Sequence, residues 1–116
     1  MAAFKLPAGP ERDQTVEDAT KKAAEVPLAV MKTTLEVLRL ARVVAEKGNQ
    51  RSITDAGVAG LMARGAIEGA RYNVLINLTG LSDRPYADRL KTEVAEIATA
   101  AAEAAEEVRR LVEAKL

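Results

Sequence analysis

The chain has 116 residues, and its 17 basic and 17 acidic side chains leave no net charge that would attract nucleic acid or an anionic membrane. It contains neither cysteine nor histidine, which excludes disulfides, zinc-thiolate sites, a thiol nucleophile and the most common general base and metal ligand. Hydrophobic residues make up 48% of the chain but aromatic residues only 3%, which is typical of a helical bundle with an aliphatic, alanine-rich core.

The length leaves room for one domain, residues 1–116. No apolar run approaches the ~20 residues of a membrane span, and the start does not resemble a signal peptide. The sequence therefore predicts a cytoplasmic protein with no membrane, nucleic-acid or metal partner.

The first helix is predicted from about Glu11 to about Lys47. Pro27 interrupts it, because proline lacks the N–H that would bond four residues back, and a kink is expected there. Two apolar rows follow the proline, which indicates burial against more than one neighbour. The first row contains Leu28, Met31, Leu35, Leu38 and Ala45, and the second contains Val30, Val37, Ala41 and Val44.

The second helix is predicted after a turn at residues 48–51 and ends near Thr79. Ser52 or Thr54 is expected to cap its N-terminus through a side-chain oxygen. Asp55 falls in the first turn, where the helix dipole favours a carboxylate.

A row of small residues runs along this second helix and ends in two carboxamides. The row contains Ala59, Ala63, Ala66 and Ala70, followed by Asn73 and Asn77. Four glycines thin the helix further, at Gly57, Gly60, Gly65 and Gly69. Each costs about 1 kcal/mol relative to alanine in a helix, so we expect close approach of another helix to compensate.

The third helix is predicted after a loop in which Ser82 or Asp83 caps it and Pro85 occupies the first turn. Its apolar stripe contains Leu90, Val94, Ile97, Ala101, Ala104, Val108, Leu111 and Lys115. The expected fold is an all-α, up-and-down bundle of three long helices. Because their apolar faces are too wide to cover one another, we expect completion by an oligomer partner, such as a second subunit of a dimer, or by a missing N-terminal half.

The candidate functional residues are few. Asn73 and Asn77 either bond across helices in the core or line a pocket for a polar heterocycle. Asp55 is either a partner of the helix dipole or an acid or base. Lys21 and Lys22, with Arg64 and Arg71, could clamp an anion, although cations on amphipathic helices usually form the solvated face. Composition and periodicity alone indicate a helical oligomer.

Four segments carry a resemblance to a known family: Ala19 to Leu28 (ATKKAAEVPL), Ala45 to Asn49 (AEKGN), Ser52 to Val58 (SITDAGV) and Tyr72 to Leu78 (YNVLINL). Together they resemble the cyclodeaminase/cyclohydrolase family. The family includes the cyclodeaminase half of formimidoyltransferase-cyclodeaminase and the methenyltetrahydrofolate cyclohydrolases. The opening Met1 to Pro7 (MAAFKLP) also matches an internal segment of the family, in which a helix ends in a Lys-Leu-Pro turn.

The resemblance covers the C-terminal half of the family domain. Family members carry a Pro-Gly-Gly-Gly-Ser segment and an acidic Asp-Ala-x-Ala-Phe stretch in their N-terminal half, and this sequence has neither. The resemblance implies a protein of folate one-carbon metabolism. Its activity would be that of a cyclodeaminase of 5-formimidoyltetrahydrofolate or a cyclohydrolase of 5,10-methenyltetrahydrofolate. Its candidate substrate-binding residues are Asn77, Asn73, Asp55 and Lys5. No catalytic residue is assigned, and no cofactor is expected besides the tetrahydrofolate substrate.

Two other functions are compatible with the sequence. A non-catalytic helical assembly module would keep the packing of the family and lack its site. A chorismate-mutase-like helical dimer is the less favoured alternative, because it requires converging cations where this sequence has amides.

Overall fold

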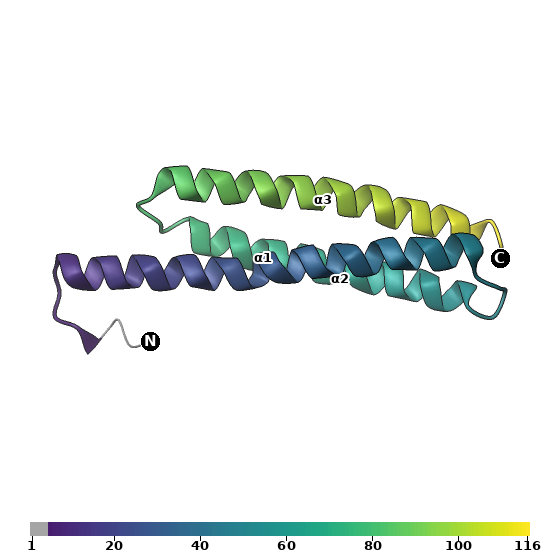
Figure 1. Ribbon diagram of the computed structural model, residues 1–116, viewed down its shortest axis with the longest axis horizontal. Helices are drawn as coiled ribbons and strands as arrows, with labels where there is room; N and C mark the ends of the chain where they lie inside the picture. Colours follow the sequence, from purple (N-terminus) through teal and green to yellow (C-terminus); the bar gives the residue numbers. More distant parts are fainter. Residues whose placement is uncertain (1–4) are drawn as a thin grey trace.

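The computed structural model describes residues 5–116, which form three long helices running up, down and up (Figure 1). Helix α1 spans Pro10–Lys47, α2 spans Ile53–Leu78 and α3 spans Arg84–Glu113. The predicted all-α, up-and-down bundle is confirmed, and residues 5–116 contain no strand. The helix end that the family resemblance implies at Met1 to Pro7 lies largely outside the described residues.

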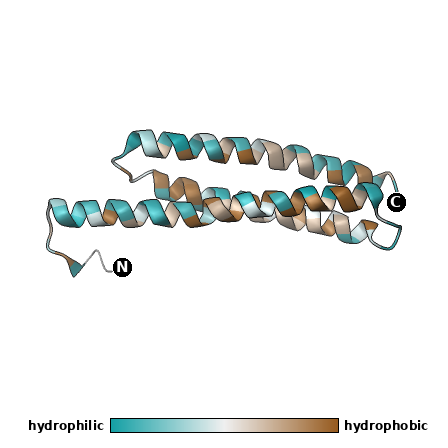
Figure 2. Cartoon of the chain, viewed as in Figure 1, coloured by the Kyte–Doolittle hydropathy of each residue, from teal (hydrophilic) through white to brown (hydrophobic). Residues whose placement is uncertain are grey.

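The bundle is long and narrow. Its principal extents are 62 × 24 × 15 Å, and each helix packs against both others. The first predicted row of α1 and the stripe of α3 supply part of the core, since Met31, Leu38 and Val108 are at most 1% exposed. The core residues Ile67 and Val74 of α2 lie outside the predicted row of small residues. The second predicted row of α1 is not buried as expected, because its valines are 41–45% exposed. No polar or charged side chain among residues 5–116 is buried. Figure 2 shows that the first half of α1 is mostly hydrophilic, whereas its second half carries many hydrophobic residues. None of the helices in the described part is long and apolar enough to cross a membrane.

The start of α3 follows the sequence prediction. The side chain of Asp83 accepts a hydrogen bond from the backbone N–H of Tyr86 at 3.1 Å, and Pro85 lies in the first turn. Proline is tolerated there because the first N–H groups of a helix have no intrahelical partner.

The predicted side-chain cap of α2 is wrong. Ser52 precedes the helix, but its hydroxyl donates to the backbone carbonyl of Asn49 at 3.0 Å and caps no N–H of α2. The side chain of Asn49 instead accepts from the N–H groups of Arg51 and Ser52. An asparagine that bonds to the backbone two residues ahead stabilises the turn itself, and Asp55 remains in the first turn of the helix, as predicted.

The glycines of α2 fall into two groups. A Cβ atom added at Gly60 would lie 2.9 Å from a methyl group of Val108, and one added at Gly57 would lie 3.1 Å from a methyl group of Val112. Close approach of α3 therefore requires glycine at position 60, as predicted, whereas a Cβ atom at position 57 would need Val112 to shift by a few tenths of an ångström. A Cβ atom at Gly65 or Gly69 would meet nothing within 4 Å. The second pair is thus not explained by packing within this chain.

Gly60→Ala and Gly65→Ala should change stability in opposite directions. Overpacking against Val108, which is β-branched and 1% exposed, should make Gly60→Ala less stable, by roughly 1–3 kcal/mol. Gly65→Ala should be more stable than the parent by up to about 1 kcal/mol, because alanine favours the helix. Urea unfolding followed by circular dichroism, at a concentration where the chain is monomeric, measures both. Equal stability of the two variants would contradict the close contact between α2 and α3.

Candidate functional site

A groove of about 620 Å³ lies between α1 and α2. Its volume is within the range of about 300–1,000 Å³ that is usual for small-molecule sites. It is lined by Ala23, Val26, Pro27, Val30, Ala66, Gly69, Ala70, Asn73 and Asn77. The structure therefore brings together Asn73 and Asn77 from α2 with the proline of α1. Small side chains form the floor, and the two carboxamides supply its polar groups.

Asn77 is positioned by backbone carbonyls. Its Nδ2 donates to the carbonyl of Asn73 at 2.8 Å and, more weakly, to the carbonyl of Ala23 on α1 at 3.4 Å. Residue 27 would normally donate to Ala23, but Pro27 has no N–H. The amide of Asn77 thus lies where the proline leaves a carbonyl without its helical partner. Since both hydrogens of Nδ2 are directed at backbone oxygens, the Oδ1 atom is the group that a ligand could use.

Asn73 is more open. Its side chain is exposed, and no hydrogen bond joins it to another group in residues 5–116. It can therefore donate and accept. None of the residues that line the groove is titratable. The groove can hold a polar heterocycle between amides, but it has no group of its own to transfer a proton.

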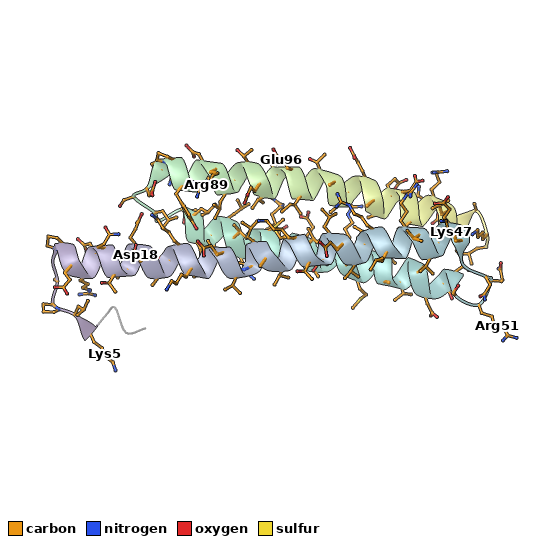
Figure 3. All side chains as sticks on the ribbon, in the orientation of Figure 1. Lys5, Asp18, Lys47, Arg51, Arg89 and Glu96 are labelled. Atoms are coloured by element: carbon orange, nitrogen blue, oxygen red, sulfur yellow. The ribbon has the colours of Figure 1, made fainter. Side chains whose placement is uncertain are left out.

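The other two predicted site residues lie away from this groove. Asp55 is exposed in the first turn of α2, and the 22 residues that separate it from Asn77 correspond to about 33 Å of helix. Lys5 is exposed before the start of α1, on the turned-back beginning of the chain (Figure 3). The roles of Asp55 and Lys5 therefore stay predictions.

Two of the four cations considered for an anion site pair with carboxylates. Lys21 pairs with Asp83 at 2.8 Å, and Arg71 pairs with Glu68 at 3.1 Å. Each of these cations has its own carboxylate, so the two do not form a joint anion site in the structure.

Four residues, here called the loop clamp, fasten the α2–α3 loop to α1: Glu17, Lys21, Asp83 and Tyr86. The carboxylate of Glu17 accepts from the backbone N–H groups of Ser82 and Asp83, each at 2.9 Å. Lys21 bonds to Asp83 and lies 4.9 Å from the centre of the Tyr86 ring. More than 60 residues separate the two sides of the clamp, so the spacing of residues along the chain gave no signal for it.

The clamp also holds the turn of α1 that leads into the groove. The hydroxyl of Tyr86 donates to the carboxylate of Glu25 at 2.9 Å, two residues before Pro27. The hydrogen bond from Lys21 lowers the pKa of the Asp83 carboxyl below its ordinary value, and the same bond raises the pKa of Lys21. Burial, followed by the bond to Glu25, raises the pKa of Tyr86 to about 12.

A second, apolar groove of about 380 Å³ lies between the start of α2 and the end of α3. Gly57 and Gly60 form part of its floor. At its rim, Arg109 is bound by Glu106 and Glu113. Arg64, one of the cations considered for an anion site, lines this groove, whereas Asn73, Asn77, Asp55 and Lys5 do not.

The chain is an all-α bundle with an open groove that carries two carboxamides. Residues 1–96 match the sequence model of the family described as Formiminotransferase-cyclodeaminase. This chain belongs to that family.

The curated relatives agree with this assignment. A methenyltetrahydrofolate cyclohydrolase of Methylorubrum extorquens is 42% identical over 97 residues, which is 78% of this chain and 47% of the relative. A formimidoyltransferase-cyclodeaminase of Dictyostelium discoideum is 32% identical over 93% of this chain, and that of Gallus gallus is 31% identical over all of it. The chain spans about half the length of the cyclohydrolase and about a fifth of the two longer proteins.

Replacing Asp83 by asparagine should remove an acid-sensitive contribution to stability. The folded pKa of Asp83 lies below its unfolded value, near 3.9. The contribution of its carboxylate is therefore complete above that value and is lost as the pH falls through the folded pKa. Asparagine still caps the helix but forms no ion pair with Lys21.

Thermal unfolding between neutral pH and pH 3 measures this effect. The parent should lose more stability on acidification than Asp83→Asn. Asp88→Asn, on the outer side of the same helix and 70% exposed, should behave as the parent does. Identical acid profiles for the parent and Asp83→Asn would show that the pair contributes nothing.

Proposed function

We propose that this protein acts in folate one-carbon metabolism, on 5-formimidoyltetrahydrofolate as a cyclodeaminase or on 5,10-methenyltetrahydrofolate as a cyclohydrolase. The observation that carries the proposal is that Asn73 and Asn77 line a groove between α1 and α2 in a chain of this family. The names of the relatives support the same chemistry.

Both reactions require a polar wall that holds the pterin and a group that moves protons. In cyclodeamination, N10 attacks the N5-formimidoyl carbon and ammonia leaves. In cyclohydrolysis, water adds to the methenyl carbon and the bridge opens. The Oδ1 of Asn77 would accept from a ring N–H, and Asn73 would donate or accept beside it. The groove is therefore proposed as one wall of the site.

The proton-transfer group must come from outside this wall, because no titratable residue lines the groove. Lys5 and Asp55 stay proposed substrate-binding residues on the strength of the family resemblance, and neither lines the groove. Tetrahydrofolate derivatives are the only small molecules that the proposal requires.

One observation favours a non-catalytic assembly module instead. Both hydrogens of the Asn77 amide nitrogen already bond to backbone carbonyls, as expected of a residue that serves packing alone. This role and ligand binding make different predictions for the variants below.

Asn77→Ser should weaken the binding of a folate analogue by about 1–3 kcal/mol, the cost of leaving a buried polar group without a partner. Isothermal titration calorimetry with 5-formyltetrahydrofolate, together with melting temperatures, measures this. Thr99→Ser, on the exposed side of α3, is the matched control and should bind like the parent. Unchanged affinity of Asn77→Ser at an unchanged melting temperature would remove Asn77 from the site.

The 116-residue chain alone should show little or no turnover. The acidic segment of the family is absent from the sequence, and loss of a proton-transfer group typically lowers the rate by about 10²- to 10⁴-fold. The absorbance of 5,10-methenyltetrahydrofolate, followed with and without the chain, measures hydrolysis. Rapid loss that depends on the chain would show that the complete catalytic site lies within these residues.

A further inference from the structure

The apolar groove between the start of α2 and the end of α3, here called the α2–α3 groove, is separate from the groove that carries the two carboxamides. Its volume of about 380 Å³ is within the range of about 300–1,000 Å³ that is usual for small-molecule sites. Gly60 in this groove lies 13 residues before Asn73, which corresponds to about 20 Å of helix. The residues that match the family model, 1–96, end before the α3 wall of the groove begins at Ala105. The proposed folate site therefore makes no use of this groove.

The walls of the α2–α3 groove are aliphatic, and part of them is open to solvent. Val108 and Val112 of α3 line it and are only 1% and 7% exposed. Val58 and Leu61 of α2 also line it, but 58% and 73% of their surface is exposed. A ligand that covers these two side chains would remove apolar surface from water, which favours binding.

The groove is elongated along the helix axes. On α2 it extends from Thr54 to Arg64, about 15 Å of helix. Because α3 runs antiparallel to α2 (Figure 1), Ala105 lies at the Arg64 end of the groove. A long groove with aliphatic walls fits an extended alkyl chain better than a compact polar molecule.

One end of the groove carries a cation that has no ion pair. Both carboxylate oxygens of Glu106 accept hydrogen bonds from Arg109, and Arg109 also donates to Glu113. The hydrogen bond from Arg109 lowers the pKa of Glu106, and the positive charge of Arg64 lowers it further, so Arg64 lies near this carboxylate. Nevertheless, no hydrogen bond or ion pair joins the exposed Arg64 to another group in residues 5–116. Its guanidinium is available to an anion.

We propose that the α2–α3 groove binds a small amphipathic anion, whose alkyl chain lies along the groove and whose carboxylate is bound by Arg64. A medium-chain carboxylate is the simplest molecule of this class. A guanidinium can hold a carboxylate through two parallel hydrogen bonds, while the chain covers Val58 and Leu61. A neutral chain would occupy the same walls but would not use the charge of Arg64. This site goes beyond the proposed folate function and does not depend on it.

Titration of the full chain with octanoate, followed by the NMR signals of its methyl groups, tests the location. The methyl signals of Val58, Leu61, Val108 and Val112 should shift until they saturate. The signals of Val26 and Val30, which line the other groove, should stay in place.

A larger side chain at Ala105 tests whether the ligand lies inside the groove. Ala105→Leu should weaken octanoate at least about tenfold, since leucine would exclude two or more methylene groups of the chain. Ala95→Leu makes the same change on the exposed side of α3, outside the groove, and should bind like the parent. Circular dichroism checks that both variants fold.

Removing the charge of Arg64 tests the anion end. Arg64→Gln should weaken octanoate about three- to fivefold, as expected for an ion pair near the surface, and should leave the binding of octan-1-ol unchanged. Arg39→Gln removes an exposed arginine of α1 outside the groove and should change neither ligand. Arg64 is exposed, so its variant should fold even if Ala105→Leu does not.

Four results would overturn the proposal. The first is the absence of saturable shifts at the four methyl-bearing residues of the groove, and the second is larger shifts at Val26 and Val30. The third is full octanoate affinity in a folded Ala105→Leu variant. The fourth is an Arg64→Gln variant that binds octanoate as the parent or Arg39→Gln does, or that weakens octan-1-ol equally. A failure of 5-formyltetrahydrofolate to bind would count against the folate function alone.

Discussion

The close packing of α2 against α3 is the constraint on which the other features depend. Gly57 and Gly60 let Val112 and Val108 approach the backbone of α2. This contact fixes which flank of α2 is covered, because a helix in close contact on one side cannot rotate without losing it. The rotation in turn places Met62, Gly65 and Gly69 on the open side, with Asn73 at the groove.

Pro27 and Asn77 link the backbone of α1 to the side chains of α2. The proline removes one helical hydrogen bond, and α1 continues through it as one helix to Lys47. The carbonyl left over, at Ala23, accepts from Asn77. The loop clamp holds the adjoining turn of α1 through Glu25 and Tyr86. Pro27 thus lines the groove, and hydrogen bonds to Ala23 and Glu25 hold the adjoining part of α1 in place.

The groove opens onto exposed apolar side chains of α1. Val26 and Val30 line the groove and are 68% and 45% exposed. An element that covered these two valines would therefore also close the groove.

The sequence determined the three helices, the first core row of α1 and the stripe of α3, a cap at Ser82 or Asp83, and the position of Asn73 and Asn77 on one helix face, because these depend on periodicity and local hydrogen bonding. Only the tertiary structure decided which glycines of α2 contact α3, since the four look alike in sequence. It also revealed the loop clamp between Glu17 and Asp83, and the bond from Asn77 to Ala23. These contacts join residues more than 50 positions apart. The packing of whole helices brings the partners together, and a local sequence pattern does not predict that packing.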